Sequence, residues 1–392
     1  MSRRTSFWLV AALLATMLAA ASAPSPLYPT YQALWGFSSV TLTLVYAVYA
    51  FAALAGLLVA GRVSDFTGRR PVVAAALLVQ IAGMFVFIAA TAVEWLFAAR
   101  VLQGLATGVA SGALSAWLLD LEPVDERHLG SVIGGLAPIA GLALGALGSG
   151  LLVQYAPDPL HLVYWLLIAV YVAALVAIIS MPDLVARRQG WVGSLRPRVA
   201  VAAPARRAFA TLTPVLVAVW AVAGLYLALG PALTISLLGT KDRVLGALVI
   251  AVLLGAGTLS ASLVRRKAPE AIVVPGSLVL MLGVGLTVGA VASGSGVGLY
   301  LGTLIAGLGF GPAFTGAFRS IAALAPPNAR AALLAALYVV IYLSFSLPAI
   351  AAGIAVSLVG VRPTLYGYGA VVIVLAGATT VALGRQTRSA AT

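Results

Sequence analysis

The stretch GRVSDFTGRRPV, residues 61–72, crowds charge into one short turn of an otherwise apolar chain. Long apolar runs lie on both sides of it, at 39–60 and 72–92. Such a turn is typical of a loop between two membrane-spanning helices, because charged side chains collect where the chain meets water. Its charged residues are Arg62, Asp65, Arg69 and Arg70.

The composition of the 392 residues is that of a polypeptide embedded in a bilayer. Only 8% of the residues are charged and 62% are hydrophobic, whereas about 25% of a soluble domain is charged. The mean hydropathy is +1.10. The net charge of +13 is spread over short gaps between apolar runs, so it indicates membrane orientation and no nucleic-acid partner. The chain has no cysteine, which excludes disulfides and thiolate metal ligands.

Continuous apolar runs of roughly 20 residues predict twelve transmembrane helices. A β-barrel is disfavoured, because its strands would be only about ten residues long and would alternate in polarity. The predicted fold class is therefore an all-α membrane protein. The predicted spans are 7–23, 39–60, 72–92, 95–119, 129–154, 160–180, 211–236, 244–264, 271–292, 297–322, 329–357 and 364–384.

The segment 181–210 divides these spans into two groups of six. It is rich in arginine, contains three prolines and has no apolar run long enough to cross a membrane. We expect a six-helix bundle at 1–180, a cytoplasmic linker at 181–210 and a second six-helix bundle at 211–392. Weak internal similarity between APIAGLALG and LPAIAAG indicates that the two bundles are pseudo-symmetric.

We expect the protein to lie in the inner membrane of the cell. The distribution of Arg and Lys predicts that both of its termini are in the cytoplasm. Most basic residues in the connecting segments then face inward, and the outer segments hold only Lys241, Arg243 and Arg362. The start MSRRTSFWLVAALLATMLAAASA imitates a secretory signal. We expect it to be retained, because its apolar run is longer than a usual signal core and its loss would leave an odd number of spans.

The chain resembles a twelve-helix transporter of the major facilitator superfamily, of the drug or metabolite efflux type. The loop signature of that superfamily is matched at five positions, and Phe66 stands where a further basic residue is usual. The matching residues are Gly61, Asp65, Gly68, Arg69 and Arg70.

The resemblance implies that this loop is a conformational latch. Asp65 would meet the start of the span 329–357, where Asn328 is a plausible cap, since helix N-termini favour anions. Arg69 would pair with Asp120 or, as second choice, Glu122. Gly61 and Gly68 would allow close helix approach and a tight turn. The alternative is a merely solvated, positively charged loop.

A second resemblance lies in ARVLQGLATG, residues 99–108, where Arg100, Gln103 and Gly104 match an Arg-x-x-Gln-Gly signature. It implies that Arg100 faces the cavity with Gln103 and helps to couple proton movement to transport. A central arginine costs about 2.5–3.5 kcal/mol or more unless it faces protein or water. The alternative is that Arg100 extends outward to the interface. For Arg319, interface exposure or a structural contact is the preferred interpretation.

A third signature is only partly matched, in the span 129–154, at Pro138, Gly141 and Gly145. In this superfamily such a Gly-Pro motif is associated with antiporters. Proline bends a helix and glycine permits close packing. Close packing without any antiport meaning is therefore the alternative.

Candidate cargo contacts are polar or aromatic side chains well inside the spans, because such transporters bind ligands near the midplane. Packing or interface roles are the alternative for each of them. The tyrosines and the tryptophan of PSPLYPTYQALWG, residues 24–36, are interpreted as structure of the outer mouth. The candidates are Tyr46, Tyr49, Gln103, Trp117, Trp220, Tyr226, Phe314, Tyr338 and Tyr342.

No Asp or Glu lies in the middle of any predicted span. This disfavours a strongly cationic cargo and leaves the proton route open, with Asp120, Glu122 and His161 as weak candidates. With only His128 and His161 as histidines, both near helix ends, the sequence offers no metal cluster and no embedded catalytic site.

The sequence thus predicts no enzyme, no bound cofactor and no metal. It predicts a monomeric secondary transporter in the lipid bilayer that uses the proton gradient to export a small amphipathic neutral or anionic substrate. An importer of a small metabolite, such as a sugar or an organic acid, is the alternative, because a fold does not set direction. A sensor or scaffold that transports nothing is a weaker alternative function.

Overall fold

The structure of the protein, a computed structural model, describes residues 1–123, 125–126, 128–183, 185, 188–240, 242–326 and 329–391, with side chains through residue 385. Lys241 and Asn328 lie outside this part of the chain. Within it every regular element is helical and no strand occurs. Twelve helical segments are long and apolar enough to cross a membrane, so the predicted number of spans is confirmed by length and composition.

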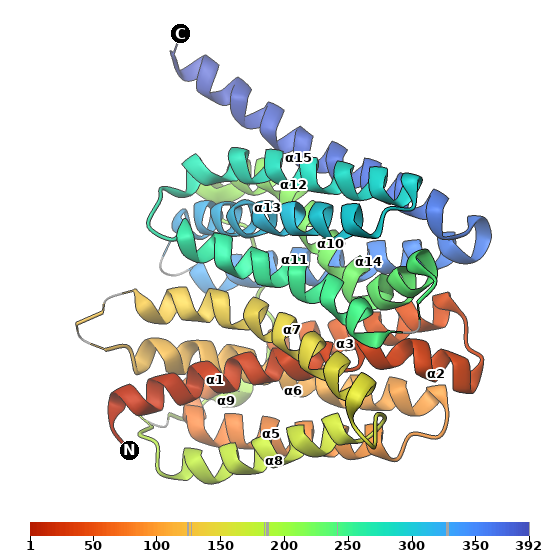
Figure 1. The fold of residues 1–392 in the computed structure, drawn as a ribbon. Helices are drawn as coiled ribbons and strands as arrows, with labels where there is room; N and C mark the ends of the chain where they lie inside the picture. Colours follow the sequence, from red (N-terminus) through yellow and green to blue (C-terminus); the bar gives the residue numbers. More distant parts are fainter. Residues whose placement is uncertain are drawn as a thin grey trace. The chain divides into compact units, whose positions relative to one another are not determined.

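Contacts divide the chain into two compact units, Met1–Phe37 with Leu44–Pro197, and Ser38–Thr43 with Arg198–Thr392. Residues 181–197, predicted as part of a linker, are grouped with the first unit. The longer helices of each unit run roughly parallel or antiparallel to one another (Figure 1).

The first unit is built around α1 and α6. Helix α1 packs against α6 and α7, and α5 packs against α6 and α8 (Figure 1). Its elements are α1 (Arg3–Ser22), η1 (Ser25–Leu27), α2 (Tyr28–Trp35), α3 (Ser39–Ala60) from Leu44 onward, α4 (Ser64–Thr67), α5 (Arg69–Ile88), α6 (Val93–Asp120), α7 (Leu129–Tyr155), α8 (Leu162–Ile179) and α9 (Trp191–Ser194).

In the second unit α13 packs against α11 and α12, while α10 contacts α11, α14 and α15. Buried glycines let these helices approach closely, as small residues do in membrane proteins. Its elements are η2 (Ala203–Ala205), α10 (Arg206–Leu238), α11 (Arg243–Leu263), α12 (Pro269–Ser293), α13 (Gly296–Ala323), α14 (Arg330–Val359) and α15 (Val361–Ala391).

The first span differs from the prediction. It does not end at residue 23 but continues to Trp35 as a broken helix made of α1, η1 and α2. Proline at the first positions of η1 and α2 is compatible with a new helical turn, because the first N–H groups of a helix have no partner inside it. The prolines therefore break this span and restart it.

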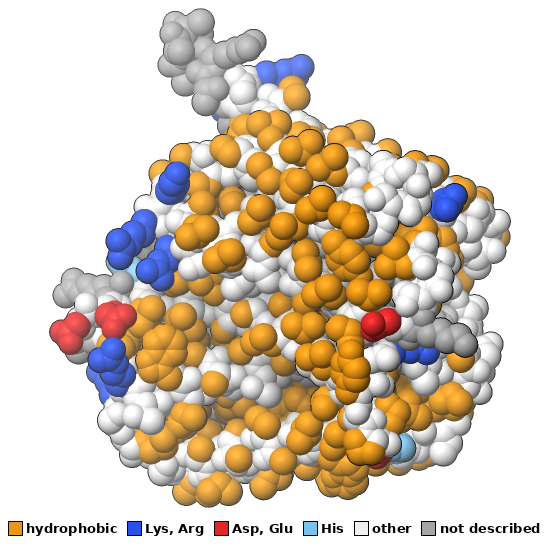
Figure 2. Space-filling model, in the orientation of Figure 1, with side chains coloured by type: hydrophobic (Ala, Val, Ile, Leu, Met, Phe, Trp, Pro, Cys, Tyr) orange, Lys and Arg blue, Asp and Glu red, His pale blue; other side chains and the backbone are white. Residues whose placement is uncertain are grey.

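The outer surface of the helices is apolar. Figure 2 shows hydrophobic side chains along the helices, with Lys, Arg, Asp and Glu gathered near helix ends. Leu144 and Leu263 are 66% and 73% exposed, which is expected of side chains that face lipid rather than water.

Candidate functional site

The loop after α3 is organised by the side chain of Arg69. Its Nε donates to Asp120 Oδ2 at 2.9 Å, and its guanidinium also contacts Ser64 at 2.8 Å and forms an ion pair with Asp65. The Arg69 side chain is 9% exposed and that of Asp65 is 48% exposed. The predicted contact between Arg69 and Asp120 is therefore present, and one guanidinium joins the start of α5, α4 and the end of α6.

Asp183 caps α5 from a distant part of the sequence. The backbone N–H groups of Arg69 and Arg70 donate to its two carboxylate oxygens, each at 3.2 Å. These N–H groups open the helix and have no partner within it. The carboxylate also lies at the positive end of the helix dipole, where an anion is favoured. No local signal around residues 61–72 indicates this role, because Asp183 lies far along the chain.

Gly68 is required at this cap for two reasons. Its φ is +98°, a conformation that side chains disfavour, and a Cβ added there would lie 2.5 Å from Asp183 Oδ2. Gly61 serves another contact, since a Cβ on Gly112 of α6 would meet its Cα at 3.1 Å. Glycine is therefore needed at position 68 for the backbone conformation and the cap, and at position 61 for the close approach of α6.

The segment after α8 is fastened to the same loop. Arg70 donates through its side chain to the carbonyl of Met181, and Trp117 Nε1 donates to the carbonyl of Pro182 at 3.1 Å. The Arg188 N–H donates to the Phe66 carbonyl at 2.8 Å. Trp117, a candidate cargo contact, is fully buried and its indole N–H is used here.

For the other residues of the expected latch, the predicted contacts are absent from the described residues or untested. Asn328, the proposed cap of the span that contains α14, lies outside the described residues. Glu122 does not pair with Arg69; its Oε1 accepts a hydrogen bond from the Gly130 N–H at 2.7 Å and so caps α7. The role of Asp65 in a latch stays a prediction.

Arg100 lies fully buried inside the first unit. Its Nε donates to the Tyr28 hydroxyl at 2.8 Å, and its Nη1 donates to the Ala21 carbonyl at 2.8 Å and to Gln103 Oε1 at 2.5 Å. Gln103 Nε2 in turn donates to the Ala20 carbonyl at 2.9 Å. Arg100 therefore does not reach the membrane interface.

Four aromatic rings surround the guanidinium, with its Cζ 4.7–5.9 Å from their centroids. They include Tyr46 and Tyr49, which were candidate cargo contacts. Such rings stabilise a desolvated cation, by about 2 kcal/mol where water is excluded. Among the described contacts of Arg100 there is no carboxylate. The rings belong to Tyr28, Tyr46, Tyr49 and Phe87.

The break in the first span explains the position of Arg100 and Gln103. Helix α1 ends at Ser22, and Pro24 has no N–H to donate to the Ala20 carbonyl. Side chains of other helices supply the missing donors, since Ser149 Oγ also donates to the Ala23 carbonyl at 2.5 Å. Arg100 and Gln103 thus act as a cap for the carboxyl end of α1, where a cation is favoured.

Tyr28 was interpreted as structure of the outer mouth and not as a cargo contact. The structure adds that it is fully buried and bonds to Arg100. Tyr31 is likewise buried, with its hydroxyl 3.3 Å from that of Tyr164. The signal that could have revealed this is the Pro-rich break, since carbonyls freed inside a membrane need donors.

Gly104, Gly141 and Gly145 bring helices into close contact. A Cβ on Gly104 would clash with the backbone of α3 at Tyr49, which holds α3 against α6 beside Arg100. A Cβ on Gly141 or Gly145 would clash with the carbonyls of Ala15 and Ala19 in α1. Pro138 lies inside α7, about one turn before Gly141 and two turns before Gly145. The two glycines of the signature in 129–154 therefore hold α7 against the broken first span.

The candidate cargo residues of the second unit fall into two groups. Trp220 and Phe314 have ring centroids 5.3 Å apart, and the series continues through Phe318 to Tyr338 at 5.7 and 6.3 Å. These side chains are half-buried. We call them the aromatic ladder. Tyr342 lies one turn after Tyr338 on α14 and is also half-buried.

Tyr226 belongs to the second group and lines a cavity elsewhere in the unit. Arg319 makes a structural contact, since its Nη1 donates to the carbonyls of Arg265 and Lys267 at 3.2 and 3.3 Å. His161 forms an exposed pair with Asp158 at 2.8 Å. Within the described residues no group of His, Cys, Asp and Glu side chains could hold a metal ion.

Comparisons with known proteins agree with this architecture. The family model described as Major Facilitator Superfamily matches residues 8–348. No curated protein sequence matches the chain significantly. Among solved structures, the chain is similar to a crystal structure of a mutant of the nucleoside transporter NupG, with a TM-score of 0.74 and 15% sequence identity. The match covers 97% of this chain and 100% of that one, and at this identity it concerns the fold.

Proposed function

The chain belongs to the major facilitator superfamily of secondary transporters, and we propose that it exports a small amphipathic compound in exchange for protons. Export would proceed by alternating access, in which cargo and proton favour different facing states. We place the protein as a monomer in the inner membrane with both termini in the cytoplasm. The positively charged loop segments support that orientation.

The observation that carries the proposal is the buried charge of Arg100. An arginine stays protonated in proteins, and no carboxylate is among its described partners. Its field therefore opposes a second cation nearby and favours neutral or anionic cargo. Since Arg100 does not release its proton, it would act by biasing the protonation and position of neighbouring groups.

The loop around Arg69 offers a second part of the mechanism. Asp65 and Asp120 share one guanidinium, so protonation of either carboxylate would weaken one of its ion pairs. We propose Asp120 as the group through which a proton loosens the latch. Asp120 suits this role because its side chain is 29% exposed, so that water can reach it.

The aromatic ladder of the second unit is the proposed cargo surface. Trp220, Phe314 and Tyr338 offer flat apolar faces, and the indole Nε1 of Trp220 is buried without a hydrogen-bond partner among the described residues. A cargo with an aromatic ring and one hydrogen-bond acceptor would satisfy both features. Tyr342 on the same helix would extend this surface.

Import is the rival function. NupG is a nucleoside transporter by its title, and a neutral nucleoside would also be compatible with an uncompensated arginine. The Pro138, Gly141 and Gly145 signature favours antiport through the resemblance stated above. Its packing against α1 is the structural alternative for the same residues.

The test begins with a thermal-shift screen of purified protein against neutral, anionic and cationic aromatic compounds. A hit is then followed in liposomes that have an acidic lumen and a neutral exterior. An antiporter accumulates external cargo as protons leave, and a protonophore abolishes the accumulation. Cargo that instead moves in the same direction as protons would establish symport and refute the export proposal.

Asp65→Asn tests whether Asp65 is needed for transport and not for folding. We expect the variant to be produced and inserted normally but to transport the hit more slowly, because Arg69 would lose one charged partner. Asp158→Asn removes another half-exposed, paired acid of the same unit and serves as the matched control. Normal flux in Asp65→Asn would remove the latch from the mechanism.

A further inference from the structure

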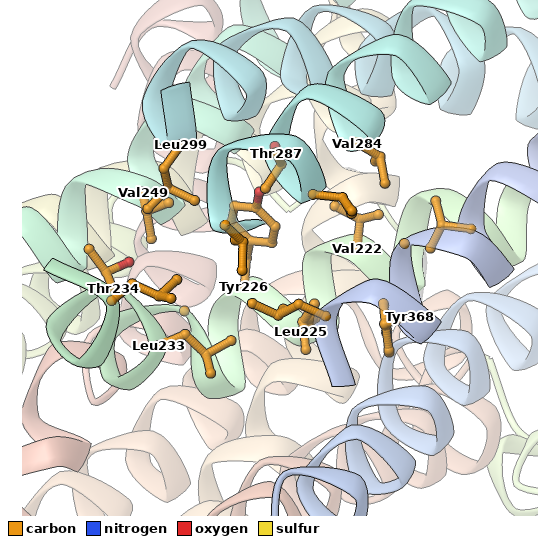
Figure 3. A pocket seen from close by; sticks show the side chains of 17 residues that line it. Val222, Leu225, Tyr226, Leu233, Thr234, Val249, Val284, Thr287, Leu299 and Tyr368 are labelled. Carbon is orange, nitrogen blue, oxygen red and sulfur yellow. The ribbon is translucent and has the colours of Figure 1, made fainter. Parts of the chain in front are cut away.

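A cavity lies inside the second unit, at the end where α10 and α12 finish and α11, α13 and α15 begin. Its internal volume is about 60 Å³, and the non-atom space reaches about 610 Å³ only when the open solvent at its mouth is included. Five helices contribute to its wall, so it is not a groove on one helix. Figure 3 shows Val222, Leu225 and Leu233 of α10 facing Val284 and Thr287 of α12 across it.

The described residues that line the wall are mainly aliphatic, and none of them is charged. Thr234 and Tyr368 are among its polar residues, and the Tyr226 hydroxyl forms a hydroxyl cluster with Thr287 and with the buried Thr303, whose Oγ1 lies 3.0 Å away. Thr287 Oγ1 donates to the Gly283 carbonyl at 2.9 Å, and Figure 3 shows the hydroxyl end of Tyr226 directed toward Thr287. Hydroxyls accept through two lone pairs, so this cluster has hydrogen-bonding capacity left for one further group.

Fixed contacts keep the space open. The Tyr368 hydroxyl donates to the Ala221 carbonyl at 2.7 Å and ties α15 to α10. On another face of α10, Gly224 lies against the carbonyl of Phe345 in α14, so that a Cβ there would clash. Because α10 is held by both neighbours, it cannot close the cavity without losing one of these contacts.

We propose that this cavity binds an uncharged, mostly apolar molecule that has a ring and one hydrogen-bonding group. Apolar cavities of protein interiors are poorly hydrated and take apolar ligands. A charged ligand would have no counter-charge in the wall, and a purely aliphatic lipid chain would leave the Tyr226 cluster unused.

The site is separate from the aromatic ladder and does not depend on the proposed export. The ladder is formed by Trp220, Phe314, Phe318 and Tyr338, and none of these four lines the cavity. A ligand here would contact α10 on both sides of Pro231, where the helix lacks one backbone hydrogen bond. Its binding would therefore stabilise one bend of α10.

The experiment uses the full chain in liposomes and trifluoromethyl-diazirinyl benzyl alcohol, an uncharged photolabel with one ring and one hydroxyl. Labelled peptides are mapped by mass spectrometry over a range of label concentrations. We expect saturable labelling of residues 222–237 and 284–299, reduced by excess trifluoromethyl benzyl alcohol. Tyr226→Phe should raise the half-saturating concentration about two- to tenfold, the effect of one neutral hydrogen bond.

A matched pair of variants tests the place of binding. Val288→Trp puts a large ring into the cavity wall, where Val288 lies against Gly369 of α15, and should abolish saturable labelling. Val374→Trp makes the same change at a position that is 68% exposed and outside the wall, and should leave labelling unchanged. Thermal unfolding of both variants checks that they are folded.

Three results would overturn the proposal. One is labelling that rises without saturation, and another is saturable labelling that Val288→Trp and Val374→Trp affect equally. The third is labelling of these peptides by a diazirine-bearing phosphatidylcholine that excess benzyl alcohol does not reduce, which would assign the cavity to a lipid chain. Since no transport is measured, failure here leaves the export proposal untouched, and failure of export leaves this site untouched.

Discussion

Removal of the Asp183 carboxylate is expected to loosen the start of α5. In Asp183→Ala, the N–H groups of Arg69 and Arg70 lose their acceptors, which lie at 3.2 Å in the protein. Loss of a side-chain cap costs about 0.5–2 kcal/mol, and loss of an anion at the helix N-terminus adds about 0.3–1 kcal/mol. Because Asp183 is half-buried, we expect about 1–2 kcal/mol in total.

Hydrogen exchange measures this change where it occurs. Amides that open locally exchange in proportion to their opening equilibrium, so 1–2 kcal/mol corresponds to exchange about 5- to 30-fold faster. The relevant peptide covers residues 66–74, and mass spectrometry of the protein in detergent follows it. Asp183→Asn keeps one acceptor oxygen without the charge, so its exchange should lie between those of the protein and of Asp183→Ala.

The control is Asp158→Ala, which removes an acid paired at 2.8 Å with His161 in the α7–α8 connection. Its effect on the 66–74 peptide should be nil, because it does not touch α5. If Asp183→Ala and the unchanged protein exchange this peptide at the same rate, Asp183 does not cap the helix and the reasoning fails. Equal acceleration throughout the first unit would instead indicate general unfolding.

Gly68→Ala should lower the thermal unfolding midpoint, because a side chain at a backbone φ of +98° costs about 1–3 kcal/mol or more. Gly134→Ala is the control: a Cβ there meets open space, so the midpoint should stay unchanged or rise. Gly145→Leu should destabilise by about 1–3 kcal/mol in chemical unfolding, since it forces α7 from α1, and Gly148→Leu should not. Arg100→Lys retains the charge but not the planar guanidinium, so it should keep the pH dependence of flux and lower the thermal stability. Arg100→Gln removes the charge and should lose that pH dependence. Identical pH profiles for the two variants would contradict this.

The number of spans could be predicted because a bilayer fixes both the length and the composition of a crossing helix. Residues 93–120 were predicted as 95–119, and the structure extends that helix by only a few residues. The first span could not be delimited in the same way. A rule based on continuous apolar length stops at the prolines after residue 23, whereas the chain restarts its helix after them.

The candidate site was predictable where the resemblance supplied the pairing. Arg69 and Asp120 could be matched because the signature names a partner at the end of the fourth span, and the structure has them 2.9 Å apart. Asp183 could not be found, because it looks like one more charge in a linker and its partners are backbone N–H groups. Glu122 was a reasonable second partner by sequence but is used at α7.

The sequence likewise identified side chains inside the spans without identifying their partners. Tyr46 and Tyr49 were candidate cargo contacts, and their common neighbour is Arg100 of another helix. Tyr28 was assigned to the outer mouth, and its partner is also Arg100. Contacts between helices depend on rotation and depth, which a single periodicity does not fix.

Arg100 and the break in the first span each lower the cost of the other. A buried guanidinium without a carboxylate is unfavourable in a membrane, and so is a carbonyl that a proline has left without a donor. Gln103 donates to the Ala20 carbonyl that Pro24 leaves without a donor, and Arg100 donates to the neighbouring Ala21 carbonyl, although Arg100 Nη2 is buried without a hydrogen-bond partner among the described residues. A movement of α1 against α6 would expose the charge and the carbonyls together. Coupling through Arg100 therefore requires that the two helices move as one piece, or that a proton or cargo group replaces the contact that is lost.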